Sequence, residues 1–452
     1  MSVLRLRAVA VVATLGALAG AGPASAHARA HRIGGVIADV ARAAPVHPAV
    51  AARSARAGAA VRAASEPGLP YQGGSVLHRN RTHLVFWQPA RSGLVFEPGY
   101  EALIEQFLAR VAADSHHPTN VYGLTGQYRD AQGPAAYASS YGGAVLDSDR
   151  LPANQCAEPP AAPPGWSVCL TDTQLEAELE RVVSAHHLPR GADDIYFIVL
   201  PDGFGSCIDS SSQACALGGG SDGYCGYHSE TQDGLLYAVI PYNGVPGHCQ
   251  SSNPRPNGSA ADPTISSLSH EHNETITDPQ LDAWIDSAYN EDGDLCISDF
   301  GPALGGSGSA AWDEVIDGGH YWIQEEWSNE DNSCQPRDES DTVSFSVSGR
   351  AVSGAPLTLT GHAGDPDGRI VAYSWSFGDR GSARHRASTH TYGRAGAYRV
   401  ILRVTDSAGN WAFATRTLRI ASSSASRRHG GRGGTSRRGA AAPSTRRAQR
   451  AG

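Results

Sequence analysis

The sequence predicts two folded domains of different class, an α+β or α/β domain over residues 71–335 and an all-β sandwich over residues 339–421. In the first segment, helix-type and strand-type hydrophobic patterns alternate, which is typical of a sheet covered by helices. All eight cysteines lie between Cys156 and Cys334, so disulfides are expected to brace this domain. After Cys334, short alternating runs separated by Gly, Asp and Pro indicate strands alone.

The elements of the α+β domain follow from the spacing of its apolar residues. Residues 84–87 are an apolar run that predicts a buried strand, and residues 100–113 carry apolar side chains at helical spacing. Loops rich in Tyr and Gly come next, before a second helix around residues 173–185. Apolar runs at 195–200 and 235–240 predict two further strands.

A third helix is predicted over residues 263–276. Pro263 suits the first helical position, and Asp262 is placed to cap the helix. Pro279 prevents the helical pattern from continuing far beyond this stretch.

This helix carries a His-Glu-x-x-Glu motif formed by His270, Glu271 and Glu274. Residues four apart share one face of a helix, so His270 and Glu274 are expected to project together with Glu271 beside them. An imidazole and a carboxylate that bind zinc, with a glutamate that accepts a proton from water, form the arrangement of a zinc peptidase. The alternative is a solvated helix face with a capping carboxylate.

The cysteine count predicts four disulfides, because an even number of cysteines in an exported chain is usually paired. Sequence alone leaves 105 connectivities open. A zinc site made of thiolates is the competing interpretation, although the spacings lack a Cys-x-x-Cys pair. Pairing of nearest neighbours would join Cys156 to Cys169, Cys207 to Cys215, Cys225 to Cys249 and Cys296 to Cys334.

Charge is unevenly distributed along the chain. Residues 71–335 contain 36 Asp and Glu against nine Arg, a net charge of −27, whereas residues 336–421 carry +4. A strongly acidic domain argues against a nucleic-acid partner and is compatible with cation binding.

The two ends of the chain are expected to lie outside the folded domains. Residues 1–26 combine two arginines, a short apolar run and a small-residue end, as in a secretory signal peptide, and residues 27–70 predict a flexible leader or pro-segment. Residues 422–452 contain eight Arg and no acidic residue, and they predict a disordered tail. Because the chain starts with a predicted signal peptide and no segment is long enough for a transmembrane helix, we expect a secreted protein, extracellular or associated with the cell surface.

Several short motifs in the first domain resemble two known families. Early landmarks are similar to the EXORDIUM-like, phosphate-induced secreted proteins of plants: Tyr71-Gln72-Gly73-Gly74-Ser75-Val76-Leu77, the apolar strand that ends at Trp87, Cys225-Gly226-Tyr227-His228 and Gly247-His248-Cys249. Later landmarks resemble secreted bacterial proteins with a zincin-like metallopeptidase domain: the His-Glu-x-x-Glu motif with Thr277-Asp278-Pro279, then Glu291-Asp292-Gly293-Asp294-Leu295-Cys296, and Trp322-Ile323-Gln324-Glu325-Glu326-Trp327-Ser328-Asn329.

The second resemblance implies that Glu291 is the third zinc ligand. Asp278 and Asp294 are alternatives, since the first follows the helix closely and the second lies beside a cysteine. Residues 290–294 also suit an ordinary turn or a calcium-binding loop, because hard carboxylate oxygens lie close together. His228 and His248, each near a cysteine, are interpreted as loop histidines held by backbone hydrogen bonds rather than as ligands.

The second domain closely resembles a polycystic kidney disease (PKD) domain, an immunoglobulin-like β-sandwich. The motifs are Gly364-Asp365-Pro366-Asp367-Gly368, Tyr373-Ser374-Trp375-Ser376-Phe377-Gly378-Asp379, His390-Thr391-Tyr392 and the strand from Gly396 to Asp406. Trp375 is expected to fill the core, while Asp365 and Asp379 are expected to fix turns. The resemblance implies a module that contacts polymers, proteins or the cell envelope, assisted by the basic tail.

Two functions of different class follow from the sequence. The first is a secreted zinc-dependent hydrolase, a peptidase, in which His270, Glu274 and Glu291 bind zinc and Glu271 is the general base. The second is a non-catalytic extracellular or wall-associated binding protein built on the same disulfide-braced scaffold.

Overall fold

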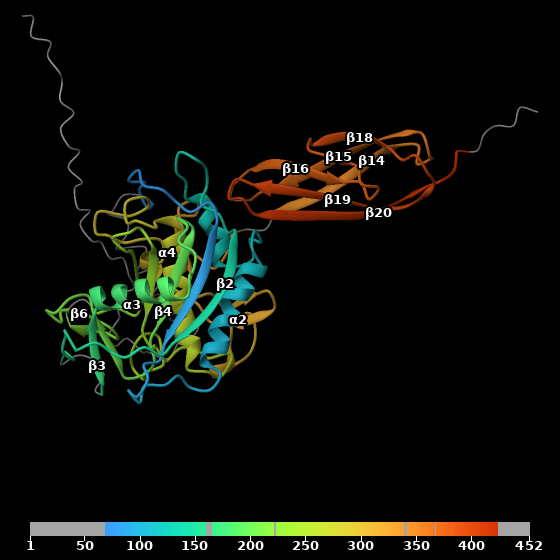
Figure 1. Ribbon diagram of the computed structural model, residues 1–452. Coiled ribbons are helices and arrows are strands. Elements are labelled where there is room, and N and C mark those ends of the chain that lie inside the picture. Colours follow the sequence, from blue (N-terminus) through green and yellow to red (C-terminus); the bar gives the residue numbers. More distant parts are fainter. Residues whose placement is uncertain (1–67, 160–164, 221–222, 339–340, 367, 424–452) are drawn as a thin grey trace, which may run out of the picture. The chain divides into compact units, whose positions relative to one another are not determined.

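The computed structural model describes residues 68–159, 165–220, 223–338, 341–366 and 368–423 of the chain (Figure 1). These residues form two compact units, the first built mainly from the chain before residue 341 and the second mainly from the chain after it. The predicted signal peptide, almost all of the predicted leader and nearly the whole of the predicted tail lie outside the described residues.

A five-stranded sheet forms the centre of the first unit, with the strand order β2-β1-β4-β9-β8. Strands β1 (Asn80–Trp87), β2 (Ser139–Asp147), β4 (Asp194–Val199) and β9 (Leu236–Ile240) run parallel. Strand β8 (Tyr227–Glu230) pairs with β9 in the antiparallel direction and lies at one edge. The sheet is therefore mixed, with a single antiparallel edge strand.

Three α-helices cover this sheet on both faces: α2 (Tyr100–Ala113), α3 (Asp172–Ala185) and α4 (Ala261–Thr277). The apolar residues of α2 and α4 share one core with one face of the sheet, whereas those of α3 form a second core with the opposite face. In Figure 1, α3 and α2 can be followed on different sides of the strands labelled β2 and β4. Because both faces are buried, strands β4 and β9 are almost wholly apolar, as is the second half of β1.

The predicted helices agree closely with these elements. Helix α2 has the predicted bounds, and α3 begins one residue earlier than expected, with Thr171 and Gln174 forming a capping box. Helix α4 begins two residues before Pro263. Asp262 does not cap it, because its carboxylate accepts N–H groups from Asn257 and Ser259 in the preceding loop.

Strand β2 falls in the stretch that the sequence predicted as loops, and that prediction is wrong. Two consecutive glycines, Gly142 and Gly143, interrupt its apolar pattern. A Cβ atom at Gly142 would lie 2.2 Å from a ring atom of His83, so glycine allows β2 to pair closely with β1.

The short elements of the first unit are β3 (Val168–Thr171), β5 (Phe204–Cys207), β6 (Ala214–Cys215), β7 (Gly219–Gly220), β10 (Glu314–Ile316), β11 (Gly319–Tyr321), β12 (Glu326–Ser328), β13 (Ser333–Gln335), η1 (Val121–Gln127), η2 (Asp294–Cys296) and η3 (Gly308–Ala310).

Four disulfides brace the first unit, and they join nearest neighbours in sequence. The pairs are Cys156–Cys169, Cys207–Cys215, Cys225–Cys249 and Cys296–Cys334. The expected four disulfides are confirmed, and their nearest-neighbour pairing is one of the connectivities that the sequence left open. No cysteine is free in the described part of the chain.

The second unit is an all-β sandwich of two antiparallel sheets, as predicted. One sheet has the order β14-β15-β18 and the other β17-β16-β19-β20. Trp375 is buried in the core between them, and Asp379 accepts a backbone N–H from Gly381 in a turn, so both expected roles are confirmed. The strands are β14 (Thr342–Gly349), β15 (Pro356–Gly364), β16 (Ile370–Ser376), β17 (Ser382–Ala383), β18 (Ala387–Thr391), β19 (Gly396–Asp406) and β20 (Trp411–Ile420).

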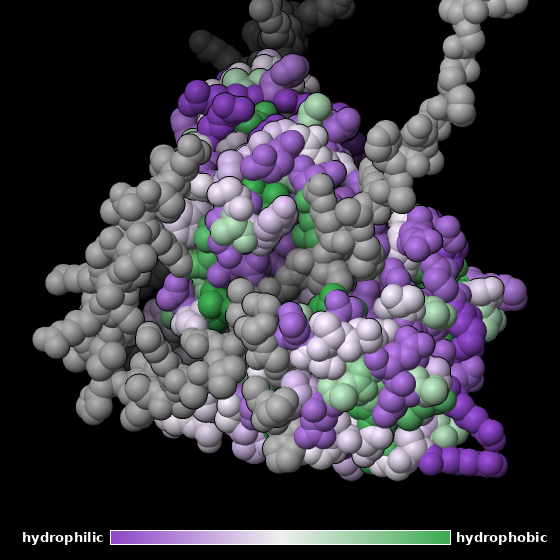
Figure 2. Space-filling model, turned by 90° about the vertical axis from the view of Figure 1, so that its left-hand side faces the viewer, coloured by the Kyte–Doolittle hydropathy of each residue, from purple (hydrophilic) through white to green (hydrophobic). Residues whose placement is uncertain are grey.

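On the face shown in Figure 2, apolar side chains form small separate areas among hydrophilic ones. Among the described helices, none combines the length and the apolar character needed to cross a membrane.

Candidate metal centre

Four segments of the first unit bring histidine and carboxylate side chains together. Helix α4 supplies His270, Glu271 and Glu274, and the edge strand β8 supplies His228. The segment that leads into η2 supplies Glu291, Asp292 and Asp294, and strand β12 begins with Glu326. The predicted motif on α4 is therefore part of a larger cluster drawn from distant parts of the sequence.

The first group of donors consists of His270, Glu274 and Asp294. Their candidate ligand atoms lie within 4.8 Å of one another. His270 Nε2 is 2.9 Å from Glu274 Oε1 and 3.7 Å from Asp294 Oδ1. Neighbouring ligand atoms of a tetrahedral zinc ion lie roughly 3.3 Å apart, given zinc bonds of about 2.0–2.1 Å. The spacing of this group therefore fits a zinc ion.

The second group of donors is centred on His228. Its Nε2 atom lies within hydrogen-bond distance of Glu291 Oε2, at 3.1 Å, and 3.8 Å from Glu274 Oε2. Ligand atoms of His228, Glu271 and Glu274 also lie within 4.8 Å of one another. Glu274 thus belongs to both groups, with one oxygen toward each imidazole.

The buried side chain of Asn243 joins helix α4 to the segment just before strand β8. Its amide nitrogen donates to the carbonyl of Cys225 and to the hydroxyl of Ser267, both at 2.8 Å. Gly226 follows Cys225, and a Cβ atom there would lie 2.7 Å from Glu271 Oε1. A glycine at this position therefore allows β8 to approach the helix.

His270 is oriented by Gln324. The amide nitrogen of Gln324 lies 2.8 Å from His270 Nδ1 and donates to the carbonyl of Gly293 at 2.6 Å. Because an amide nitrogen can only donate, His270 Nδ1 accepts this hydrogen bond, and the side chain of Gln324 thereby holds the imidazole in place.

The electrostatics of the cluster are those of a cation site. Burial raises the pKa of Glu274 well above its usual range, and Asp292 raises it further. Burial likewise raises the pKa of Glu291 and of Asp294, with Glu274 adding to both. Burial lowers the pKa of His228 to about 3, so its imidazole is neutral, which is the form that binds metals.

Several buried atoms of the cluster have no hydrogen-bond partner among the described residues. They are His228 Nδ1, His270 Nε2, Glu274 Oε2, Asp294 Oδ1 and both carboxylate oxygens of Glu326. Buried carboxylate oxygens without donors are costly unless a cation or a proton satisfies them. The donor set, its spacing and these atoms together fit a divalent metal ion.

The predicted site residues have different places in this cluster. His270 and Glu274 lie together as expected, and Glu271 lies beside Glu274. Glu291 contacts His228, while Asp294 is the carboxylate grouped with His270. The alternative ligand Asp278 instead holds the turn after α4, because its Oδ1 accepts the backbone N–H groups of residues 282 and 283.

Two members of the cluster were missed by sequence reasoning. His228 was interpreted as a loop histidine held by the backbone, which is wrong because its ring faces Glu291 and Glu274. For His248 the same interpretation is confirmed, since its Nδ1 bonds the carbonyl of Leu217. The second missed residue is Glu326, which lies within one of the quoted motifs and had no assigned role.

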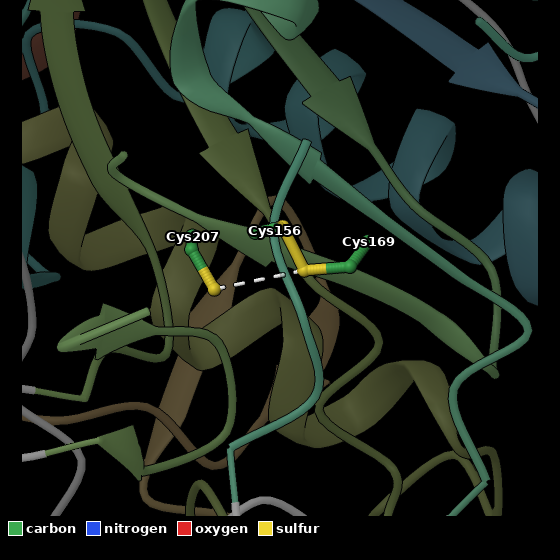
Figure 3. Close-up of side chains that lie close together, drawn as sticks. All are labelled: Cys156, Cys169 and Cys207. Atoms are coloured by element: carbon green, nitrogen blue, oxygen red, sulfur yellow. Dashed lines mark hydrogen bonds between the residues drawn. A yellow bond between two sulfur atoms is a disulfide. The ribbon is translucent and has the colours of Figure 1, made fainter. Parts of the chain in front are cut away.

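A zinc site made of thiolates is excluded among the described residues. The sulfur atoms of Cys169 and Cys207 are 3.7 Å apart. Figure 3 shows Cys207 beside the disulfide between Cys156 and Cys169. The fourth cysteine, Cys215, is bonded to Cys207. Sulfur atoms in disulfides are not thiolates, so this group cannot serve as a zinc ligand set.

The side chains of the cluster are buried. His228, His270, Glu271, Glu274 and Glu291 have no exposed surface. An ion held by these residues would therefore be enclosed by protein on the sides that they occupy.

Comparison with known proteins identifies the second unit. Residues 342–419 match the PKD domain family, so the predicted sandwich is a PKD domain. A solved structure of the PKD1 domain of Vibrio anguillarum Epp is 28% identical, with a TM-score of 0.18, and the match covers 19% of this chain and 100% of that domain.

Curated relatives match within the same region. A microbial collagenase of Vibrio alginolyticus is 48% identical over 56 residues, which are 12% of this chain and 7% of the collagenase. The pre-pro-metalloprotease PrtV of Vibrio cholerae is 35% identical over 69 residues, which are 15% of this chain and 8% of PrtV. The chain therefore spans less than a tenth of the length of these relatives, and the likeness is that of an accessory module.

Proposed function

We propose that this protein is a secreted zinc-dependent hydrolase, a peptidase with a zincin-like first domain and a PKD accessory domain. The observation that carries the proposal is the convergence of His270, Glu274 and Asp294, with Glu271 on the adjacent turn of α4. PKD domains in a collagenase and a metalloprotease support it at the level of domain organisation.

His270 and Glu274 would hold the zinc ion, with Asp294 as the third ligand. Glu291, the third ligand that the resemblance implies, lies on the side of His228. When bound, zinc polarises a carbonyl group and makes water more acidic. Glu271 has a carboxylate oxygen close to the donor atoms of His228 and Glu274, where it can take a proton from water and return it to a leaving amine. Gln324 would keep His270 in the orientation that binds the ion.

A second function is favoured by one observation, the burial of every side chain of the cluster except that of Asp294, which is partly exposed. An enclosed ion stabilises a fold without reacting with a substrate. In that case the protein is a non-catalytic extracellular binding protein, and the PKD domain and the basic tail make its contacts with the cell envelope or a polymer. Calcium would then be an alternative to zinc, because most donors of the cluster are carboxylates.

Metal analysis and hydrolysis of a fluorescent generic protein substrate separate these functions. For the hydrolase, we expect zinc in the purified protein, its loss in His270→Ala, and a fall in hydrolysis of about 10²–10⁴-fold in Glu271→Gln with zinc retained. His248→Ala is the matched control, because this histidine lies outside the cluster and should keep both zinc and activity. Wild-type protein without any transition metal would refute the hydrolase, and zinc without hydrolysis would favour the binding protein.

A further inference from the structure

The two donor groups of the cluster meet at one residue, Glu274, whose two oxygens face different imidazoles. Glu274 Oε1 is 2.9 Å from His270 Nε2, and Glu274 Oε2 is 3.8 Å from His228 Nε2. We propose that the centre binds two divalent cations bridged by the Glu274 carboxylate. This inference rests on the proposed metal site and extends it to a second ion.

Each side of Glu274 has a similar set of donors. On one side, His270 lies 3.7 Å from Asp294 Oδ1, and on the other side His228 lies 3.1 Å from Glu291 Oε2. The first cation would thus have His270, Asp294 and one oxygen of Glu274, and the second would have His228, the other oxygen of Glu274 and a carboxylate beside His228. A carboxylate that uses one oxygen for each ion suits the separation of about 3.5–4 Å found in two-metal sites.

Unpartnered atoms in the cluster lie on both sides of this bridge. Glu274 Oε2, on the His228 side, and Asp294 Oδ1, on the His270 side, are buried and have no hydrogen-bond partner among the described residues. Both oxygens of Glu326 share this property, and the charge of Glu326 interacts with those of Glu274 and Asp294. One ion held by His270 would leave the atoms near His228 unsatisfied.

The charge of the cluster also favours two cations. Seven carboxylate side chains influence one another at this site: Glu271, Glu274, Asp278, Glu291, Asp292, Asp294 and Glu326. A divalent cation favours the ionised form of the carboxylates that it contacts, and a bridged pair would contact carboxylates on both sides of Glu274.

Zinc stoichiometry tests the proposal. After removal of metal with a chelator and addition of Zn²⁺, we expect about two zinc ions per wild-type chain by mass spectrometry of metal content. His228→Ala and Glu291→Gln should each retain about one, since they remove ligands from one side alone. Glu291→Gln keeps the size of the side chain and can still form a hydrogen bond with His228, so a loss of zinc in this variant would not result from unfolding. His248→Ala should retain about two.

The outcomes distinguish the second ion from the first. One zinc ion per wild-type chain would overturn the bridged pair and leave the proposed hydrolase standing, whereas no zinc would remove both. Cobalt-loaded wild-type protein gives a check without substitution. A carboxylate-bridged Co²⁺ pair couples magnetically, so its electron paramagnetic resonance intensity per cobalt should fall below that of a sample loaded with one ion per chain. Unchanged intensity per cobalt at full loading would also overturn the bridge.

Discussion

Gly293 lies against the first donor group, and there is no space for a larger side chain at this position. A Cβ atom at this position would lie 2.6 Å from His270 Nδ1 and 2.9 Å from Glu274 Oε1. Its φ of −71° is one that alanine adopts without strain, so a substitution acts through contact alone. The backbone of residue 293 therefore forms one wall of the candidate metal centre.

Gly293→Ala should weaken zinc binding by about 10–100-fold, the range seen when the support of a metal ligand is disturbed. The added methyl group must displace the ring of His270 or the carboxylate of Glu274. Competition with a chromogenic chelator measures the effect. Gly393→Ala is the control, because nothing lies within 4 Å of its added Cβ, and it should bind zinc as the wild type does. Equal affinity in both variants would contradict the place assigned to Gly293.

Elements with strong local patterns were predictable, and the remainder depended on long-range contacts. Helix α2 has the predicted bounds because five apolar residues recur on one face. Strand β2 could not be found in this way, since its pairing depends on β1 and its glycines disturb the pattern. In the site, the motif on α4 was visible because its residues are four apart. His228 and Glu326 were not, because the pairing of β8 with β9 and the disulfide near β12 bring them there.

Strands β1 and β4 are joined at their first residues by a charged group that should make the first unit sensitive to acid. Asp194 accepts hydrogen bonds from Arg81 at 2.6 Å and from His83 at 2.8 Å. Burial alone would raise the pKa of Asp194, but these donors and the backbone N–H of Gly191 hold it below its usual value. The folded state therefore binds a proton at Asp194 less readily than the unfolded state does.

The lowered pKa of Asp194 in the folded state predicts how the stability of the first unit changes with pH. The contribution of Asp194 is complete above the unfolded pKa of about 3.9 and is lost as pH falls through the lower folded pKa. Asp194→Asn should cost about 1.5–3 kcal/mol near pH 6, because hydrogen bonds to a charged acceptor are lost, and less at pH 3. Urea unfolding between pH 3 and 6 measures the difference. Asp379→Asn, in the PKD domain, is the control and should leave the first-unit transition unchanged. A wild-type advantage that grows toward pH 3 would contradict the assignment.

The two units are stabilised by different means. All four disulfides lie in the first unit, where they close segments of 8 to 38 residues, whereas the PKD domain has a continuous apolar core and no cysteine. The candidate metal centre also lies wholly in the first unit. Reducing agents and zinc should therefore act on one unit and not on the other.

Calorimetry of the full chain should accordingly show two thermal transitions that respond separately. Loss of a native disulfide typically lowers the free energy of unfolding by about 2–5 kcal/mol, and the whole free energy of unfolding of a domain is about 5–15 kcal/mol. A phosphine reductant, which would break all four disulfides, should therefore abolish the transition of the first unit. Zinc at about 100 times its dissociation constant should stabilise the same unit by about 2.7 kcal/mol and raise its midpoint. Leu402→Ala identifies the other transition, because Leu402 is fully buried in the sandwich and its truncation should cost about 2–5 kcal/mol there alone. If the reductant shifted both transitions together, the two units would unfold as one, and the separation of their stabilities would be wrong.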